Sequence, residues 1–496
     1  MKDSKFQKDI YTVFVEGDEN MSVCSVAGSG KTTVITGCIK RIPADKDSIY
    51  IAFNNHTVNE LKSKLPNSKT LITTIHSFGW KAIMRSTNYK AELLKSKSYK
   101  YIEIILKKNA ITEPKLKSFY TYKFSVMIDL IRLNLADSTE EIIQISEKYD
   151  MSLEEGDPDM LLEILEMMNS DFFRYDFVDM VYRPVIDKLR LPKFDYIFVD
   201  ESQDLSRCQQ VIISKIKKHN GRALFVGDPS QSIYGFAGAD YQSFQNLNTM
   251  FPNTIKLPLS VCYRCSKAVV AEAQRINEQI MPFKKNPEGT VRNGKIDEIK
   301  NADWVICRNL KPLVQLNMFF LDRGMKSFIK GVEIGIGLAK TLEKTTSNRV
   351  ESSLKEFEIT INREIVKLKK KGVSNPKRTE KIDNMLQKLE IMTILADGCI
   401  FTKDLVAKIK AIFKDSGEGV MLSTIHKTKG LENERIFFLL PSLLPSKFAT
   451  QEWNLEQERN LEYVAITRAK LDLIYLHENE FTIVVNRIKE LLERTK

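Results

Sequence analysis

The sequence contains no long apolar run, no low-complexity tract and no internal repeat. No stretch approaches the roughly 18 consecutive apolar residues that mark a membrane-spanning helix. Charged residues interrupt the N-terminal MKDSKFQKDIYTVF, so the apolar core of a secretory signal peptide is missing as well. We therefore expect a soluble, intracellular protein without a membrane partner, located in the cytoplasm or in a nucleoid or nucleus. For a viral protein we expect the host cytoplasm.

Cysteines with the spacing of metal ligands are also scarce. Only Cys262 and Cys265 are spaced like half of a zinc site, and no second pair lies within the distance of a zinc finger. The odd number and scattered positions indicate small buried side chains in a reducing compartment. We expect no structural metal, with the Cys262 and Cys265 pair as the remaining alternative. The seven cysteines are Cys24, Cys38, Cys208, Cys262, Cys265, Cys307 and Cys399.

Positive charge exceeds negative charge in this chain. It has 75 Lys and Arg against 64 Asp and Glu, a formal net charge of +11. Such a balance suits a polyanionic partner, although many basic proteins bind none. A length of 496 residues is too great for one compact core and predicts two main domains with inserted pieces.

Short apolar runs rich in Val, Ile, Phe and Tyr alternate with amphipathic stretches of helix length. This alternation is typical of a parallel sheet covered by helices on both faces. The sequence therefore predicts an α/β fold with two such domains in series. The expected strands are 21–26, 48–53, 71–74, 196–200, 223–227 and 254–257, then 304–307, 419–424, 435–440 and 471–476.

Two segments break the alternation. Residues 85–185 are predicted to be a helical insertion in the first domain, which comprises 1–84 plus 186–280. Residues 338–415 form a short insertion in the second domain, which comprises 281–337 plus 416–496. The second insertion contains the Lys-rich segment EIVKLKKKGVSNPKRTEK, broken by Pro376. Its lysines fit either a solvated helix face, which we favour, or a surface that follows nucleic-acid phosphates.

The segment MSVCSVAGSGKTT, residues 21–33, leads from a buried strand through a turn of small residues into a helix. Gly28 and Gly30 allow a tight bend that brings backbone N–H groups against phosphate at a helix N-terminus. Lys31 is expected to reach the β and γ phosphates, and the Thr32 hydroxyl to bind Mg²⁺. Ser25 stands where the general phosphate-loop pattern has glycine. The expected nucleotide-binding residues of this loop are Ala27, Gly28, Ser29, Gly30, Lys31, Thr32 and Thr33.

A second motif, YIFVDESQD, places two adjacent carboxylates at the carboxyl end of a buried strand, where open α/β sheets bind ligands. We expect Asp200 to hold Mg²⁺ and Glu201 to act as the general base on water. The alternative is a helix cap. The next strand leads into GDPSQSIYGFAGA, in which Gln231 can contact the γ phosphate and Phe236 can face nucleic acid. For Tyr234 we favour core packing.

These motifs and others resemble, in order, the UvrD/Rep type of superfamily 1 DNA helicases. The resemblance covers both expected domains and neither insertion. It implies two RecA-like P-loop NTPase domains in tandem, each a parallel sheet flanked by helices. Its motifs are SVAGSGKTT, AFNNHTVNEL, TTIHSF, DESQD, VGDPSQSIYGFAGA, LSVCYRCS, STIHKTKGLE and ERNLEYVAITRAK.

The resemblance also implies further contacts to ATP. Gln7 falls where the family reads adenine, and Tyr263 resembles the aromatic residue that stacks on the same base. Arg264 resembles an arginine that contacts the γ phosphate, and Arg468 resembles the arginine finger of the second domain. Glu432 resembles the ribose contact. The implied cofactors are ATP and Mg²⁺.

The residues that resemble the single-strand path of the family are Phe53, Asn55, His76, Phe236, Thr424 and His426. Stacking on aromatic rings contributes about 1–3 kcal/mol per base whatever the sequence, which suits a motor that must move along any strand. Two departures stand out: Phe236 replaces a usual Trp, and Ala237 replaces a usual Arg.

The resemblance implies an ATP-dependent helicase that moves 3′ to 5′ on single-stranded DNA, engages junctions with duplex and acts as a monomer in replication or repair. RNA remains an alternative substrate. Three other functions stay open: a translocase that strips proteins and unwinds weakly, an ATP-regulated nucleic-acid-binding scaffold, and a P-loop kinase or GTPase. The last leaves the second α/β half unexplained.

Overall fold

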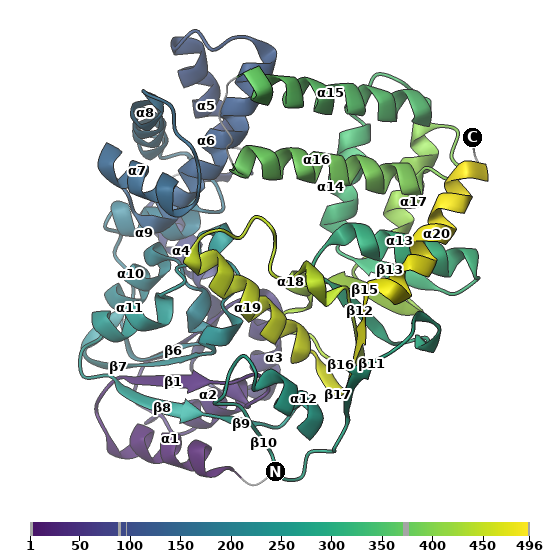
Figure 1. Ribbon diagram of the computed structural model, residues 1–496. Helices are drawn as coiled ribbons and strands as arrows, with labels where there is room; N and C mark the ends of the chain where they lie inside the picture. Colours follow the sequence, from purple (N-terminus) through teal and green to yellow (C-terminus); the bar gives the residue numbers. More distant parts are fainter. Residues whose placement is uncertain (1–2, 88–90, 96, 371–375, 495–496) are drawn as a thin grey trace. The chain divides into compact units, whose positions relative to one another are not determined.

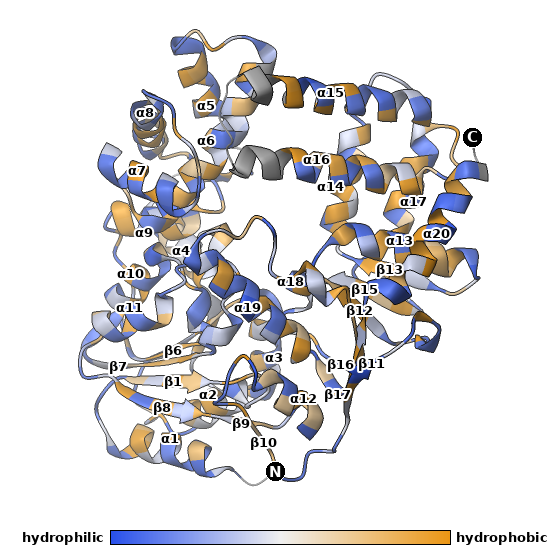
Figure 2. Ribbon diagram, in the orientation of Figure 1, coloured by the Kyte–Doolittle hydropathy of each residue, from blue (hydrophilic) through white to orange (hydrophobic). Residues whose placement is uncertain are grey.

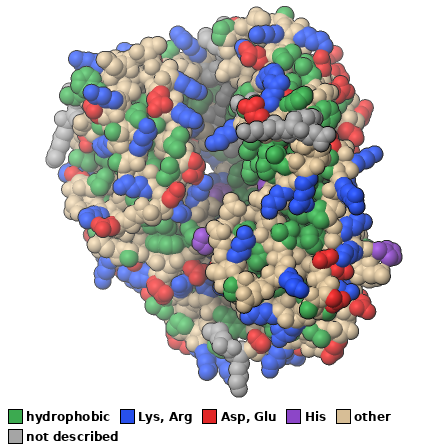
Figure 3. Space-filling view, turned by 180° about the vertical axis from the view of Figure 1, so that it is seen from behind, with side chains coloured by type: hydrophobic (Ala, Val, Ile, Leu, Met, Phe, Trp, Pro, Cys, Tyr) green, Lys and Arg blue, Asp and Glu red, His purple; other side chains and the backbone are tan. Residues whose placement is uncertain are grey.

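The computed structural model describes residues 3–87, 91–95, 97–370 and 376–494 (Figure 1). The chain divides into two compact units, Met1–Val261 and Cys262–Lys496. None of the described helices is long and apolar enough to cross a membrane. Lys and Arg side chains are scattered over the face seen in Figure 3.

The first unit is built on a six-stranded sheet in the order β3-β2-β6-β7-β1-β8. Every neighbouring pair in it is parallel. The predicted strands are confirmed within two residues at their ends, except that β7 begins six residues before the predicted strand 223–227. Runs of Val, Ile and Phe predict these strands because such residues fill the buried interior of a parallel sheet. The strands are β1 (Met21–Ser25), β2 (Ser48–Ala52), β3 (Leu71–Thr74), β6 (Phe194–Val199), β7 (Lys217–Gly227) and β8 (Ile255–Leu259).

Helices connect these strands, and several begin at side-chain caps that the sequence supplies. Ser4 and Gln7 form a capping box at the start of α1, and Asn54 accepts the Thr57 N–H at the start of α3. The apolar sides of α1, α2 and α3 join the core under the sheet. The helices of the first unit outside the segment between β3 and β6 are α1 (Lys5–Glu16), α2 (Lys31–Ile39), α3 (Asn55–Lys64), α10 (Arg207–Lys215) and α11 (Ser243–Met250), and α4 (Ile75–Ser86) directly follows β3.

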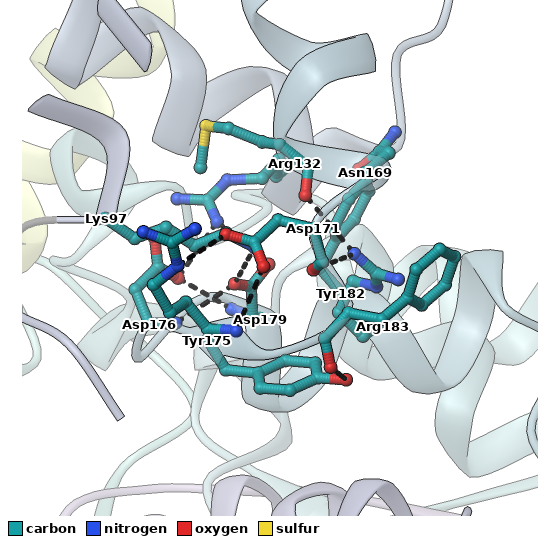
Figure 4. A network of polar contacts seen from close by, with 12 residues as sticks. Lys97, Arg132, Asn169, Asp171, Tyr175, Asp176, Asp179, Tyr182 and Arg183 are labelled. Carbon is teal, nitrogen blue, oxygen red and sulfur yellow. Dashed lines mark hydrogen bonds and ion pairs between the residues drawn. The ribbon is translucent and has the colours of Figure 1, made fainter. Parts of the chain in front are cut away.

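The segment between β3 and β6 is mostly helical, as predicted, but it also contains a short parallel ribbon of β4 (Glu92–Leu93) and β5 (Arg174–Tyr175). Buried charges link its helices: Arg132 contacts Asp176 at 2.9 Å and Asp179 at 3.1 Å, and Lys97 contacts Asp179 at 2.8 Å (Figure 4). Removing one partner of such a buried group costs about 3–5 kcal/mol. The helices are α5 (Lys97–Lys108), α6 (Pro114–Asn134), α7 (Thr139–Lys148), α8 (Asp157–Asn169) and α9 (Asp179–Ile186).

The second unit has a seven-stranded sheet in the order β11-β17-β16-β12-β15-β13-β14, again parallel throughout. Apolar residues predominate in its central strands β12, β15 and β16 (Figure 2). Three of these strands, β11, β13 and β14, were not predicted. The strands are β11 (Thr290–Asn293), β12 (Trp304–Cys307), β13 (Ser327–Lys330), β14 (Phe413–Lys414), β15 (Val420–Thr424), β16 (Asn433–Leu439) and β17 (Ala469–Leu476).

Several helices of the second unit pack against this sheet, and α13 and α20 contribute to its core, whereas α15 and α16 pack against each other and against other helices. Pro376 begins α16, so the predicted break at this proline corresponds to a helix start. The choice between the two interpretations of the Lys-rich segment lies outside the described residues. The helices are α12 (Lys267–Ala273), α13 (Leu310–Asp322), α14 (Val332–Leu342), α15 (Val350–Lys370), α16 (Pro376–Leu395), α17 (Thr402–Ile412), α18 (Ile425–Thr428), α19 (Glu452–Ile466) and α20 (Glu478–Arg494).

The division between the units lies at Val261 and Cys262, earlier than the predicted boundary after residue 280. The residues between the observed and the predicted boundary include α12, which packs against β11, β17 and α19 of the second unit. A two-stranded ribbon of β9 (Val261–Cys262) and β10 (Met281–Pro282) flanks this helix. The assignment of functional domains to residue ranges stays a prediction.

Candidate nucleotide and nucleic-acid sites

The phosphate loop lies between β1 and α2, as the sequence predicts. Gly28 and Gly30 have φ of 67° and 85°, which a residue with a Cβ adopts only with strain. The Ser25 hydroxyl donates to the Gly227 carbonyl at 2.7 Å, so serine is accommodated where the general pattern has glycine. The loop thus has the tight bend and the helix start of a phosphate-binding turn.

Lys31 lies among acidic side chains. Its ammonium group is 2.7 Å from Glu201 Oε2. Burial disfavours the charged lysine, but the carboxylates of Glu201, Asp228 and Asp200 outweigh it, so the pKa of Lys31 lies above its ordinary value. The lysine therefore stays charged at neutral pH.

The carboxyl groups of two acidic residues beside Lys31 have raised pKa values. Burial, followed by the charge of Glu201, raises the pKa of Asp200 to about 6. Burial also raises the pKa of Asp228 to about 6, although Lys31 acts against it. Three carboxylates thus share one lysine, and a further cation would relieve their repulsion. Glu201 has a φ of 50°, a strained backbone conformation of the kind found at functional sites.

Gln203 connects this cluster to the next loop. The sequence did not predict this connection. Gln203 Nε2 donates to Glu201 Oε2 at 2.7 Å, and Gln203 Oε1 accepts the Asp228 N–H at 3.0 Å. A Cβ on Gly227 would come within 2.6 Å of Gln203 Oε1, so the glycine leaves room for this bridge. Gln231, the expected γ-phosphate contact, is buried and donates to the Asp228 carboxylate.

The side chains at the phosphate loop fit ATP with Mg²⁺. Ser29 Oγ is buried and has no hydrogen-bond partner among the described residues, so a donor or acceptor is available inside the loop. The crowded carboxylates suit a divalent cation, and Mg²⁺ commonly takes only one or two protein oxygens besides water and phosphate. The Thr32 hydroxyl and the Asp200 carboxylate would hold it.

Gln7 approaches the loop from α1. Its Nε2 lies 3.5 Å from the position of a Cβ on Gly30. The capping bond from Ser4 N to Gln7 Oε1, 2.8 Å long, fixes the orientation of the amide. The Thr33 carbonyl accepts a bond from the Tyr11 hydroxyl at 3.4 Å, which ties α1 to α2. Gln7 and the loop are therefore neighbours, although Gln7 precedes Gly30 by 23 positions in the chain.

Two of the ATP contacts implied for the second unit, Arg264 and Glu432, contact each other. Arg264 Nε lies 2.5 Å from Glu432 Oε2, so the expected phosphate contact and ribose contact form an ion pair. Tyr263 packs against Phe283 with ring centroids 5.0 Å apart. The neighbouring Cys262 and Cys265 are buried, and no cluster of three or more His, Cys, Asp or Glu able to hold a metal occurs among the described residues.

Arg468 follows α19 and is buried. Its Nε donates to the Val464 carbonyl and one terminal nitrogen to the Leu431 carbonyl, both at 2.9 Å. A weaker bond joins it to the Thr428 carbonyl at 3.4 Å. The other terminal nitrogen donates to the Thr467 hydroxyl at 3.2 Å, so several acceptors of the second unit hold the guanidinium.

An aromatic stack is the main feature near the sensor loop. Phe53 and Tyr234 stack with centroids 5.7 Å apart at 12°, and Tyr234 meets Phe236 edge-on at 6.3 Å. Phe53 and Phe236 are 44% and 59% exposed, so both side chains are accessible from solvent. Tyr234 is only half-buried and links the two exposed rings, a position that the core interpretation did not foresee.

A second stack involves Phe177, which is not among the predicted nucleic-acid contacts. The Phe177 ring lies 4.1 Å from the His76 ring at 18°, and it is 62% exposed. Burial lowers the pKa of His76 to about 4, so its ring is neutral at pH 7. The segment YDFVD around Phe177 carries no recognisable motif, and only folding brings it beside TIHSF.

The remaining expected nucleic-acid contacts occupy strand and helix ends. Asn55 is the exposed first residue of α3. Thr424 ends β15, and His426 lies on the short α18 that follows. Burial, then the charge of Arg308, lowers the pKa of His426, to about 3, so this ring is also neutral.

Known families match most of the chain. The UvrD/REP helicase N-terminal domain matches residues 6–252, and the UvrD-like helicase C-terminal domain matches residues 132–480. F-box DNA helicase protein 1 of Schizosaccharomyces pombe is 25% identical over 94% of this chain and 56% of its own length. The ATP-dependent DNA helicase Rep of Buchnera aphidicola is 22% identical over 91% of both chains.

PcrA of Bacillus subtilis, named an ATP-dependent DNA helicase, is 26% identical over 50% of this chain and 36% of its own length. The chain thus spans about half of the first of these relatives and almost all of Rep. The N-terminal domain match covers almost half of the chain, and the C-terminal domain match covers more than half. The order of the two matches agrees with the order of the two parallel sheets along the chain. The chain belongs to the UvrD/Rep type of superfamily 1 helicases, a family of ATP-dependent DNA helicases.

Proposed function

We propose that this chain hydrolyses ATP to move along single-stranded DNA and to unwind duplex ahead of it. The observation that carries the proposal is the cluster at the first sheet, where Lys31 lies 2.7 Å from Glu201 beside the buried Asp200. A charged lysine, a base and a metal-binding acid at a phosphate loop are the parts that phosphoryl transfer from a triphosphate requires.

In this proposal Lys31 binds the terminal phosphates and releases Glu201, which then accepts a proton from the attacking water. Bound Mg²⁺ supplies positive charge to the phosphate oxygens. Gln203 keeps the Glu201 carboxylate oriented through its 2.7 Å bond. Arg468 leaves its carbonyl acceptors and stabilises charge that develops in the transition state, as the resemblance implies.

Coupling to DNA follows from the loop after β7. That loop carries both Gln231, which contacts the Asp228 carboxylate, and Phe236, whose ring is exposed. A shift of Gln231 on loss of the γ phosphate therefore acts on the same short segment that offers Phe236 to a base. Phe53 extends this aromatic surface through Tyr234, and Phe177 on His76 offers a second ring on which a base can stack.

Tailed duplexes test the proposal. The wild type should unwind a duplex with a 3′ single-stranded tail and should leave one with a 5′ tail intact, as family resemblance implies. Glu201→Gln should bind ATP and DNA but lose at least about a hundredfold in turnover, because the general base is absent. Phosphate release and strand separation by gel measure both, with DNA and RNA substrates in parallel.

Each outcome of this assay selects one function. Turnover and movement without strand separation would favour the protein-stripping translocase. DNA binding without turnover in the wild type would favour the scaffold, and turnover that no nucleic acid stimulates would favour a P-loop enzyme of another kind. Equal turnover by the wild type and Glu201→Gln would remove the assignment of the base.

Phe236→Ala should uncouple hydrolysis from movement. The ring is exposed and makes no part of the phosphate cluster, so ATP turnover should persist in part while unwinding falls. Loss of one stacked base costs about 1–3 kcal/mol of single-strand affinity, roughly fivefold or more. Unwinding rate and ATP turnover are measured on the same tailed duplex. Phe173→Ala, at another exposed phenylalanine of the first unit, serves as the control, and unchanged unwinding by Phe236→Ala would contradict the assignment.

A further inference from the structure

Tyr50 lies on β2 with its side chain fully buried, and its hydroxyl donates to Asp200 Oδ2 at 2.7 Å. The two residues are 150 positions apart in the chain. They meet because β2 and β6 are parallel neighbours, with Tyr50 paired to Phe198 and Ile51 to Val199. Asp200 then continues the ladder through its N–H, which donates to the Ile51 carbonyl at 3.1 Å.

Both oxygens of the Asp200 carboxylate are restrained. Oδ1 accepts the Glu201 N–H at 2.9 Å, and Oδ2 accepts the Tyr50 hydroxyl. A carboxylate offers about four lone-pair positions, so these two bonds fix the rotamer and leave acceptor capacity for a cation or its water. Lys31, the nearby cation, forms its ion pair with Glu201.

Packing alone does not account for the hydroxyl. The Tyr50 ring belongs to the core beneath the first sheet, together with Val23, Phe198 and Val226. A phenylalanine would fill the same volume, whereas a buried hydroxyl costs free energy unless it finds a partner. The partner is a carboxylate at the phosphate loop, which gives the hydroxyl a role at that site.

We infer that Tyr50 is a positioning residue that holds the Asp200 carboxylate ready for the divalent cation that accompanies ATP. The inference rests on the proposed ATP-hydrolysing function. Groups that orient a metal ligand in this way typically change metal affinity by about 10- to 100-fold when they are removed. Tyr50 itself touches neither the nucleotide nor the metal in this proposal.

The test is Tyr50→Phe in the full chain, with Mn²⁺ as the probe. Free Mn²⁺ is counted by electron paramagnetic resonance in the presence of a non-hydrolysable ATP analogue. We expect Mn²⁺ to bind about tenfold more weakly to Tyr50→Phe than to the wild type. We also expect the Mg²⁺ concentration for half-maximal ATP turnover to rise, while turnover at saturating Mg²⁺ largely recovers.

Tyr101→Phe is the matched control. The Tyr101 hydroxyl also donates to a buried aspartate, Asp171, but within the helical insertion and away from the phosphate loop. The Mn²⁺ affinity of the Tyr101→Phe variant should equal that of the wild type. Equal Mn²⁺ affinity for Tyr50→Phe and the wild type would overturn the inference, whatever happens to thermal stability.

A donor-retaining replacement covers the case in which Tyr50→Phe does not fold. Replacement of Tyr50 by 4-aminophenylalanine keeps a weaker donor at the same place, so an intermediate Mn²⁺ affinity is expected and an unchanged one overturns the inference. A wild type that binds no Mn²⁺ with the nucleotide analogue overturns this inference and the proposed function together. A wild type that binds it without unwinding DNA overturns only the motor function, since the affinity comparison still decides the role of Tyr50.

Discussion

Lys31→Ala should reduce ATP turnover to the background rate while binding of single-stranded DNA persists. Lys31 lies among Glu201, Asp200 and Asp228, so its removal leaves carboxylates facing the incoming triphosphate without their cation. Repulsion of the substrate and loss of the phosphate contact act in the same direction. Phosphate release with saturating single-stranded DNA measures turnover, and fluorescence anisotropy of a labelled oligonucleotide without ATP measures binding.

Lys40→Ala is the matched control for this substitution. Lys40 is the exposed C-cap residue of the same helix, α2, and it has no part in the acidic cluster. ATP turnover by the Lys40→Ala variant should equal that of the wild type. Retention of wild-type turnover by Lys31→Ala would contradict the phosphate-loop assignment, and loss of DNA binding in Lys31→Ala would show a general defect of folding.

Arg468→Lys should lower single-turnover ATP cleavage by about 10³- to 10⁵-fold, the range known for arginine fingers in related phosphoryl transfer. Lysine keeps the charge but lacks the planar fork of donors that meets developing phosphate charge. ATP affinity should change little, because the contact forms only in the transition state. Rapid-quench cleavage of bound ATP measures the chemical step, and equilibrium titration of a fluorescent nucleotide measures affinity.

The surroundings of Arg468 give this variant a second expected effect. The guanidinium donates to the carbonyls of Val464 and Leu431, and lysine cannot satisfy both. Thermal unfolding is therefore followed in parallel, with Arg459→Lys, an exposed arginine of α19, as the control. If cleavage falls only in proportion to the folded fraction, Arg468 stabilises the second unit and is not the arginine finger.

Most of the strands that sequence patterns predicted lie inside a sheet, and the exceptions are β3 and β8 at the two edges of the first sheet. Runs such as those of β6 and β12 are apolar because the interior of a parallel sheet excludes water on both faces. The unpredicted β11 and β14 are at the two edges of the second sheet, and β13 is next to an edge. Edge positions tolerate short and polar sequences such as TVRN in β11, so the hydrophobic pattern is weak there.

Contacts that depend on a single distant partner could not be predicted from the sequence. The Tyr50 hydroxyl, the Gln203 amide oxygen and the Phe177 ring each acquire a role from a residue elsewhere in the chain, which is Asp200, Asp228 and His76, respectively. Nothing in their local neighbourhoods distinguishes them from an ordinary buried tyrosine, a polar turn residue or an exposed phenylalanine. The pairing of Arg264 with Glu432 was hidden for the same reason.

The amino-acid sequence alone determined the phosphate loop, the acidic strand end and the alternation of strands and helices. Such features are local, since positive φ at Gly28 and Gly30 or burial of a Val and Ile run depends on residues adjacent in the chain. Only the tertiary structure decided that Lys31 meets Glu201 across 170 positions and that Tyr50 meets Asp200. These contacts depend on the order and register of the strands. Strand order and register in turn arise from packing of the whole sheet.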